Sequence, residues 1–411
     1  MLYSFKLGRN KELSIAEIAA VFTEKKVEEM IDNHLIVHTG EQLNQQSIDR
    51  LGGTIKISQI VAECEKADLA AKISEAVLKH CDIDSKITYA INIEPITYKS
   101  KKLLKSLLIE TKKTLKTEGA KVRFMNKFNR DEAKNIENIQ SKKEILDKDN
   151  SIEINIIQKS DTLYMVSFLV ASQDIDGYSK RDYEKPCRDA INGMLPPKLS
   201  QILINLSLAG MHHVDPKNIT IVDPFCGSGS LLIEALLMGF HATGSDINPK
   251  MISDSKMNVD WLRKNYGVHK KQDCIVFPHD ATERLPKAKR MALIATEGYL
   301  GDPMTVYPSE EEIKRNFEII TSLYADFFKN LWHMHDKVTI AICIPNYIKK
   351  HQSREPKDLL ERIKRLGFKQ VPLISRNLTP KINPGKKGDV LSYLYSRPDQ
   401  IVGRRIHVFQ K

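Results

Sequence analysis

The sequence of 411 residues has few of the features that mark a secreted, metal-binding or membrane protein. Its six cysteines are scattered, with no Cys-x-x-Cys pair and no cysteine–histidine cluster at zinc spacing, so we expect no metal and a reducing compartment. No apolar run approaches the roughly 20 residues that a bilayer requires, and no apolar segment follows the first basic residues. These absences predict a cytoplasmic protein without a membrane span.

The charge balance points to an anionic partner. Lys and Arg number 63 against 52 Asp and Glu, a formal net charge of +11. The excess is concentrated in residues 99–130, which hold eleven Lys or Arg and two acids. Four leucines at helical spacing in this stretch predict an amphipathic helix with a basic outer side; they are Leu104, Leu107, Leu108 and Leu115.

This basic helix has two interpretations. A solvated surface is one, because exposed lysines need no partner. The next segment, "AKVRFMNKF", interleaves Phe124 and Phe128 with basic residues, which favours a surface that binds RNA phosphates. The residues that we expect to bind nucleic acid are Lys101, Lys105, Lys112, Lys116, Arg123, Lys127 and Lys198. For Lys198 an ion pair with neighbouring acids is the alternative.

The order of elements divides the chain. Residues 1–98 alternate short strands and helices, and residues 99–171 read helix, strand, helix, strand, strand. Residues 173–195 are charged and then proline-bearing, which is typical of a linker. From 196 to 411 strands and helices alternate regularly, which predicts an α/β fold with a doubly wound parallel sheet. The last two strands, "LSYLYSR" and "GRRIHVFQK", have no helix between them and predict a terminal antiparallel hairpin.

The segment "IVDPFCGSGSLLIEA" predicts a ligand-binding turn between a strand and a helix. Gly227 and Gly229 allow close approach of a ligand, whose negative group the helix N-terminus can bind. The next strand ends in Asp246, nineteen positions after Gly227, where a carboxylate can accept both hydroxyls of a ribose. A dinucleotide is the first rival, but Leu232 occupies the third glycine position of that motif, and S-adenosylmethionine fits better.

Three successive strands end in aspartate on the side where such sheets bind ligands. We expect the methionine carboxylate of the cofactor at the turn amides, its ribose at Asp246 and its adenine amine at Asp280. The residues expected to bind the cofactor are Asp223, Pro224, Cys226, Gly227, Gly229, Asp246, Ile247, Asp280 and Ala281.

Several of these motifs resemble those of a known family. "DPFCGSGSLLIEA" and "GSDINPKMI" resemble motif I and the acidic motif of class I methyltransferases that act on exocyclic amines of bases. "RDYEKPCRDAINGMLPPKLSQILINLS", "LGRNKELSIAE" and "YSRPDQIVGRRI" resemble the THUMP-domain tRNA guanosine N2-methyltransferase family, so that the resemblance spans nearly the whole chain.

The resemblance implies a domain organisation and an activity. It implies a ferredoxin-like region at 1–98, a THUMP-like RNA-binding domain at 99–172, a linker at 173–195 and a Rossmann-like methyltransferase domain at 196–411. The implied reaction moves a methyl group from S-adenosylmethionine to the exocyclic N2 amine of a guanosine in tRNA.

The catalytic motif departs from the family pattern. The family's fourth methyltransferase strand ends in Asp-Pro-Pro-Tyr-Gly, whereas this chain has "EGYLG" from Glu297. The resemblance implies that Glu297, with a nearby carbonyl, accepts protons of the amine and that Tyr299 provides the aromatic face for the base. The acceptor is kept, but the rigidity of the two prolines is not.

Alternatives stay open. One is an amino-methyltransferase acting on rRNA or DNA, and another is a catalytically inactive RNA-binding relative that keeps the cofactor fold. A base-carbon methyltransferase would need a cysteine nucleophile, for which Cys343 at a strand end is the candidate. The sequence does not specify the nucleotide, the number of methyl groups, the oligomeric state or whether a small activating protein subunit is needed.

Overall fold

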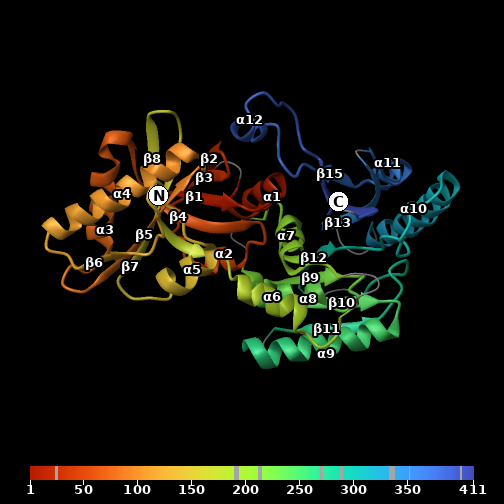
Figure 1. Ribbon diagram of the computed structural model, residues 1–411. Coiled ribbons are helices and arrows are strands. Elements are labelled where there is room, and N and C mark those ends of the chain that lie inside the picture. Colours follow the sequence, from red (N-terminus) through yellow and green to blue (C-terminus); the bar gives the residue numbers. More distant parts are fainter. Residues whose placement is uncertain are drawn as a thin grey trace.

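The computed structural model contains two β-sheets, one in each half of the chain (Figure 1). It describes all residues except 24–25, 189–193, 212–214, 269–271, 287–289, 333–337, 351 and 399. Within the described ranges, no helix is both long and apolar enough to cross a membrane.

The N-terminal half is built on one sheet of eight strands, in the order β2-β3-β1-β4-β8-β7-β5-β6. Its elements are β1 (Leu2–Leu7), α1 (Lys11–Phe22), β2 (Val27–Ile31), β3 (His34–His38), α2 (Gln45–Asp49), β4 (Thr54–Glu65), α3 (Leu69–His80), β5 (Ile87–Glu94), α4 (Tyr98–Thr117), β6 (Val122–Phe124), α5 (Asn138–Gln140), β7 (Ser151–Gln158) and β8 (Leu163–Ser172). Because β4 pairs with β1 on one side and with β8 on the other, it joins the two parts of the sheet.

The order predicted for residues 99–171 is confirmed, since α4, β6, α5, β7 and β8 follow one another in that sequence. The boundary expected at residue 98 falls between β5 and α4. It does not separate two sheets, because β5, which precedes it, pairs with β6 and β7, which follow it. The division into a ferredoxin-like and a THUMP-like domain stays a prediction, and the two parts share one sheet.

The C-terminal half has the predicted parallel strands, in a sheet that also contains antiparallel ones. Its elements are α6 (Ile175–Tyr183), α7 (Pro197–Ser207), β9 (Ile219–Asp223), α8 (Ser230–Leu237), β10 (His241–Asp246), α9 (Pro249–Tyr266), β11 (Cys274–Pro278), β12 (Met291–Thr296), α10 (Glu310–Trp332), β13 (Thr339–Lys349), β14 (Gln352–Arg354), α11 (Lys357–Arg365), β15 (Lys369–Val371), α12 (Thr379–Ile382), β16 (Ser392–Tyr395) and β17 (Val402–Gln410). The main order is β11-β10-β9-β12-β13-β17-β15. The chain reverses direction across the sheet between β9 and β12, and ligands bind at such switch points.

The predicted terminal hairpin is confirmed, with β16 antiparallel to β17. In addition, β17 is antiparallel to β13 along its whole length and pairs with β15 near its end. The last strand is therefore inserted between β13 and the β15–β16 edge. This insertion brings the start of β17 beside the carboxyl end of β13.

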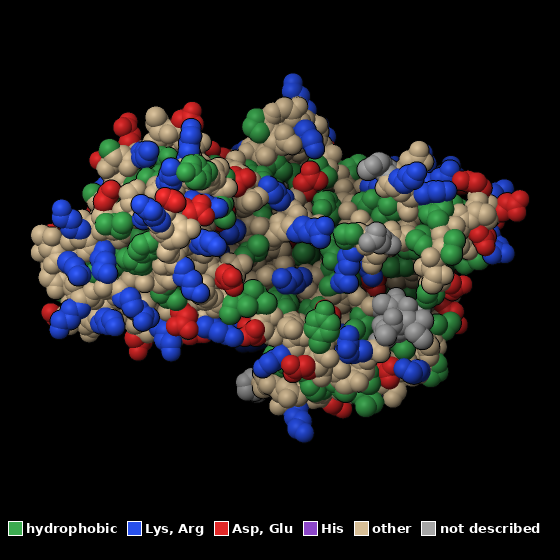
Figure 2. All heavy atoms as spheres, in the orientation of Figure 1, with side chains coloured by type: hydrophobic (Ala, Val, Ile, Leu, Met, Phe, Trp, Pro, Cys, Tyr) green, Lys and Arg blue, Asp and Glu red, His purple; other side chains and the backbone are tan. Residues whose placement is uncertain are grey.

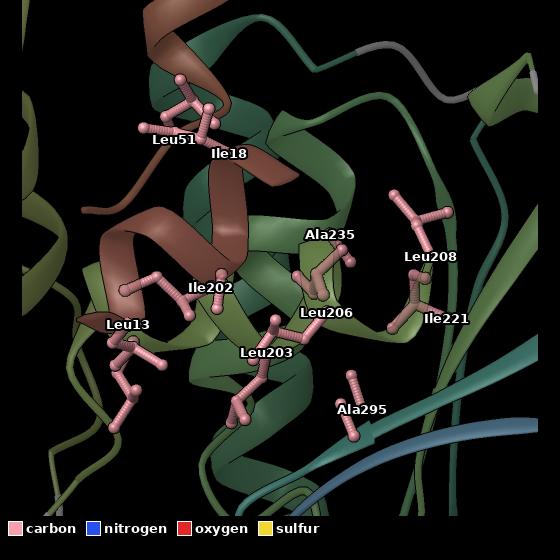
Figure 3. Packing of buried hydrophobic residues seen from close by; sticks show 14 of the residues in the cluster. Leu13, Ile18, Leu51, Ile202, Leu203, Leu206, Leu208, Ile221, Ala235 and Ala295 are labelled. Carbon is pink, nitrogen blue, oxygen red and sulfur yellow. The ribbon is translucent and has the colours of Figure 1, made fainter. Parts of the chain in front are cut away.

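The two halves share one hydrophobic core, in which α1 packs on α7. Figure 3 shows Leu13 of α1 beside Ile202 of α7, and Leu206 of α7 beside Ala235 of α8. The two halves of the chain approach closely at Gly52, where a Cβ atom would lie 2.0 Å from the carbonyl oxygen of Lys198. Only glycine permits this contact between the N-terminal half and the first turn of α7.

A buried carboxylate holds this junction together. Glu17 of α1 is fully buried and accepts hydrogen bonds from the amides of Gly52 and Gly53 and from the side chain of Asn205 in α7. Burial outweighs these bonds and the nearby Arg50, and it raises the pKa of Glu17 from 4.5 to about 7. The folded protein thus binds this proton more tightly than the unfolded chain.

This pKa shift predicts a stability that falls with rising pH. From about pH 5 to about pH 8, loss of the Glu17 proton should lower the free energy of unfolding by up to about 3 kcal/mol. We expect Glu17→Gln to reduce this pH dependence in urea denaturation, whereas Glu12→Gln, at an exposed position of the same helix, should leave it unchanged. Equal pH dependence in both variants would contradict the raised pKa.

Candidate active site

The glycine turn after β9 has the open geometry that a ligand needs. Gly227 and Gly229 have φ angles of +49° and +82°, a region that residues with side chains rarely adopt. A Cβ atom on Gly229 would lie 2.4 Å from the hydroxyl oxygen of Ser255, so this glycine lets α9 approach α8. A Cβ atom on Gly227 would meet nothing within 4 Å, which leaves space for a ligand against the backbone.

The acid at the end of β10 is held against this turn. Asp246 accepts hydrogen bonds from the amides of Gly227 at 3.0 Å and Asn248 at 2.9 Å. A carboxylate has about four acceptor positions, so two remain for the hydroxyls of a ribose. The next residue, Ile247, is 71% exposed and offers an apolar surface beside them.

The third predicted acid lies at the end of the neighbouring strand. One oxygen of Asp280 accepts hydrogen bonds from the amide and hydroxyl of Thr282, which lower the pKa of Asp280. Its other oxygen has no protein partner among the described residues and is available to an amine. The side chains of Pro224, Cys226 and Ala281 are buried, so these predicted residues can reach a ligand mainly through their backbone.

The structure adds a residue that the sequence interpretation did not include. Lys185 is 3% exposed, and its ammonium donates to the hydroxyl of Ser230, the first residue of α8, at 2.6 Å. Burial lowers the pKa of Lys185, and the nearby Glu234 already pairs with Arg181 at 2.6 Å. The carboxylates of Asp182 and Glu234 offset part of the effect of this burial. The position of Lys185 at the N-terminus of α8 also favours a bound anion, such as the carboxylate of S-adenosylmethionine. The signal in the sequence was a lysine in the segment just before the methyltransferase strands.

Replacing this lysine should weaken cofactor binding. In Lys185→Met we expect the affinity for S-adenosylmethionine to fall by about tenfold or more, because a charged hydrogen bond to the carboxylate is lost. Calorimetric titration measures this affinity, with Lys180→Met at an exposed site on α6 as the control. A folded Lys185→Met protein with unchanged affinity would show that the carboxylate binds elsewhere.

The loop after β12 is fixed by hydrogen bonds where the family has prolines. Thr296 donates its hydroxyl proton to the buried carboxylate of Asp223 at 2.7 Å and accepts from the amide of Gly298 at 3.0 Å. The hydroxyl of Tyr324 in α10 donates to the carbonyl of Tyr299 at 2.9 Å. Gly298 has a φ of +71°, and a Cβ atom there would lie 2.1 Å from the Tyr324 hydroxyl. Glycine is therefore required at this position.

Asp223, the buried acid of this network, lies at the end of β9 near two other carboxylates. Its pKa is raised to about 7, first by burial and then by Asp246 and Glu297. These residues come from the adjacent strands β10, β9 and β12. The structure thus brings together the predicted cofactor acids and the predicted catalytic acid at one edge of the sheet.

Breaking the threonine contact should loosen the loop. Thr296→Val keeps the shape of the side chain but leaves the Asp223 carboxylate and the Gly298 amide without their partner, so we expect a loss of about 1–3 kcal/mol of unfolding free energy. Thr296→Ser keeps the hydroxyl and should lose less. Urea denaturation of the two variants compares them, and equal losses would show that the methyl group, not the hydrogen bond, matters.

The predicted catalytic residues are both engaged within the protein. Glu297 forms an ion pair with Nε of Arg404 on β17, whose side chain is 9% exposed. Tyr299 donates its hydroxyl proton to Asp302 at 3.0 Å, and burial followed by this bond raises the pKa of Tyr299 to about 12. Cys343 is fully buried, and burial raises the pKa of its thiol, so the base-carbon alternative has no exposed nucleophile here.

The basic helix predicted from the sequence is α4, and its four predicted leucines are buried. Lys105 and Lys112 lie over the rings of Phe128 and Phe124, at 5.9 and 5.1 Å from the centroids. Phe128 is 46% exposed. Figure 2 shows many Lys and Arg side chains on the left of the molecule, where Figure 1 places α4, β6 and β7.

The other predicted nucleic-acid residues fall into two groups. Lys116, Arg123 and Lys127 are exposed, and with Lys105, Lys112 and Phe128 we call them the basic flank of α4. Lys101 is partly exposed and pairs with Glu132 at 3.5 Å. Lys198 lies apart from them, in the first turn of α7, and donates to Gln173 at 2.7 Å. The flank thus combines basic side chains with an exposed aromatic ring.

The strand order, the glycine turn and the acid that ends β10 are the features expected of a methyltransferase domain that uses S-adenosylmethionine. Residues 187–297 match the family model of the RMKL-like methyltransferase domain. The match includes the glycine turn, the three acids predicted to bind the cofactor and Glu297.

Curated relatives match about a third of the chain. The chain is 35% identical over 133 residues to a tRNA (guanine(10)-N2)-dimethyltransferase of Pyrococcus abyssi, covering 31% of this chain and 36% of that protein. A protein of the same description from Methanothermobacter thermautotrophicus is 33% identical over 125 residues, covering 30% of this chain and 33% of the relative. The alignments therefore span about a third of the length of each relative.

Similarity to solved structures extends over more of the chain but is distant. The structure of a "possible methylase" from Clostridium difficile 630 has a TM-score of 0.45 and 14% identity, and it covers 99% of this chain and 97% of that one.

Proposed function

We propose that this protein transfers a methyl group from S-adenosylmethionine to the exocyclic N2 amine of a guanosine in tRNA. The observation that carries the proposal is the arrangement at the sheet edge, where a cofactor site on β9 and β10 adjoins a loop with a fixed acidic acceptor on β12. The relatives are described as tRNA (guanine(10)-N2)-dimethyltransferases, which favours position 10.

The chain offers a partner for each part of the cofactor. Lys185 and the amides that begin α8 hold its carboxylate, Asp246 its ribose hydroxyls and Asp280 its adenine amine, while Ile247 packs on the adenine. The open face of Gly227 admits the cofactor against the backbone. When bound, S-adenosylmethionine supplies an electrophilic methyl group with a good leaving group, so positioning of the acceptor amine provides most of the rate.

The loop after β12 positions the amine. The guanine N2 lone pair is delocalised into the ring, so its N–H groups must be held and its nitrogen aimed at the methyl group. Glu297 accepts one N–H and the carbonyl of Gly298, which has no partner among the described residues, accepts the other, while Tyr299 stacks on the base. As the N–C bond forms, the S–C bond breaks, and the proton lost from N2 passes through Glu297 to water.

The N-terminal half delivers the RNA. Lys105, Lys112 and their neighbours on the flank of α4 meet phosphates, and Phe128 stacks on an unpaired base. Such a surface provides affinity without choosing the modified base, because phosphate contacts carry no sequence information.

The test is methyl transfer itself. Purified protein is incubated with methyl-labelled S-adenosylmethionine and unmodified tRNA transcripts, and the nucleosides are identified by mass spectrometry. We expect labelled N2-methylguanosine, and a loss of about 100-fold or more in Glu297→Ala because the amine loses an acceptor. Glu318→Ala, at an exposed position of α10, is the control and should retain activity.

Other nucleic acids serve as competing substrates. Label in rRNA fragments or duplex DNA but not in tRNA would replace the proposed substrate. Cofactor binding without transfer to any nucleic acid would favour an inactive RNA-binding relative, and absence of cofactor binding would contradict the proposed reaction.

A further inference from the structure

The ion pair between Glu297 and Arg404 spans three strands. Glu297 follows the end of β12, and Arg404 lies on β17, with β13 between them. Adjacent strands are about 4.8 Å apart, so the two side chains together bridge at least about 10 Å. Cys343 of β13 is small and buried, and both Glu297 and Arg404 lie near enough to affect the pKa of its thiol. Aspartate, one methylene shorter, is poorly suited to this span.

Arg404 has hydrogen-bond donors beyond the one that Glu297 engages. Glu297 engages Nε, and the two terminal nitrogens, Nη1 and Nη2, have no partner among the described residues. Arg404 is 7% exposed, so its guanidinium is a buried cation held beside Glu297.

Three groups at this edge form an ordered set. Arg404 donates, Glu297 accepts, and the Gly298 carbonyl accepts. Their order follows from the structure, because Glu297 is paired with Arg404 on one side and is bonded to Gly298 in the chain on the other. Enzymes that act on an extruded base read such a pattern on its Watson–Crick edge.

We infer that Arg404 selects guanine by donating a hydrogen bond to its O6 atom, while Glu297 accepts from N1–H and N2–H and the Gly298 carbonyl accepts the second N2–H. Guanine presents acceptor, donor, donor along this edge, which matches the three groups. Adenine presents a donor at N6 and an acceptor at N1, so it would face Arg404 with a donor and Glu297 with a lone pair. This assignment rests on the proposed function.

The assignment also explains the glutamate in the motif. In this chain the longer side chain reaches Arg404 and still has its second oxygen for the base. Glu297→Asp, which restores the residue typical of the family, should therefore lower activity rather than raise it. Glu297 and Arg404 therefore recognise the guanine base together.

The experiment uses a base analogue in the full-length protein. The guanosine that the wild-type protein methylates is replaced in the tRNA by 2,6-diaminopurine riboside, which keeps the N2 amine but carries an amine at position 6 and no N1–H. We expect kcat/KM of the wild-type protein to be at least about 100-fold lower for this tRNA, because two hydrogen bonds are reversed.

Two variants then test whether Arg404 causes this preference for guanosine over 2,6-diaminopurine. Arg404→Met should reduce kcat/KM on guanosine by about 30-fold, since one charged hydrogen bond to O6 is lost. The ratio of kcat/KM between the two substrates should fall by about tenfold. Arg405→Met is the control, because Arg405 is the next residue on the same strand and pairs with Glu355 at 2.8 Å. Its discrimination should equal that of the wild-type protein. Cofactor affinity should change little in both variants.

The outcomes separate the two proposals. If the wild-type protein methylates no guanosine in tRNA, the proposed function fails and this assignment fails with it. If it methylates guanosine and 2,6-diaminopurine equally, or if Arg404→Met keeps the full discrimination, only the role of Arg404 is overturned. If Arg404→Met does not fold, the test is the wild-type ratio of kcat/KM on guanosine to kcat/KM on 2,6-diaminopurine, and a ratio near one overturns the assignment.

Discussion

The hydrogen bond from Thr296 to the buried carboxylate of Asp223 ties together the two strands on which the site is built. β9 and β12 are neighbours at the point where the sheet reverses its order, and this bond connects their carboxyl ends. On the β9 side the glycine turn begins directly after Asp223, and on the β12 side Glu297 follows Thr296. The proposed methyl transfer needs a fixed separation between the cofactor and the acceptor loop, and a bond between the two strand ends provides it.

The rigidity that two prolines give the related motif comes here from side chains. Thr296, Tyr324 and the positive φ of Gly298 together fix the backbone of the loop, and Arg404 fixes the carboxylate of Glu297. Each of these partners belongs to a different part of the chain. The loop is therefore rigid only in the folded protein, whereas a Pro-Pro segment is stiff by itself.

The junction between the halves is also held by buried polar groups that pair with one another. Glu17 gathers the amides of Gly52 and Gly53 and the side chain of Asn205 within an apolar core. Arg181, Glu234 and Gln201 form a second such network beside it. Unpaired, these groups would destabilise the core, so they favour one relative placement of α1 and α7. The basic flank of α4 thereby has a defined position relative to the candidate site.

The sequence alone determined what depends on local spacing. The glycine turn, the aspartates at successive strand ends and the alternation of strands and helices predicted the parallel sheet and its binding edge, and the leucine spacing predicted α4. The pairs Thr296–Asp223, Glu297–Arg404 and Lys185–Ser230 were not predictable, because their members lie 73, 107 and 45 residues apart. Only the tertiary structure decided that the last strand enters the sheet beside β13 and brings an arginine to Glu297, since contacts at such separation leave no periodic pattern in a single sequence.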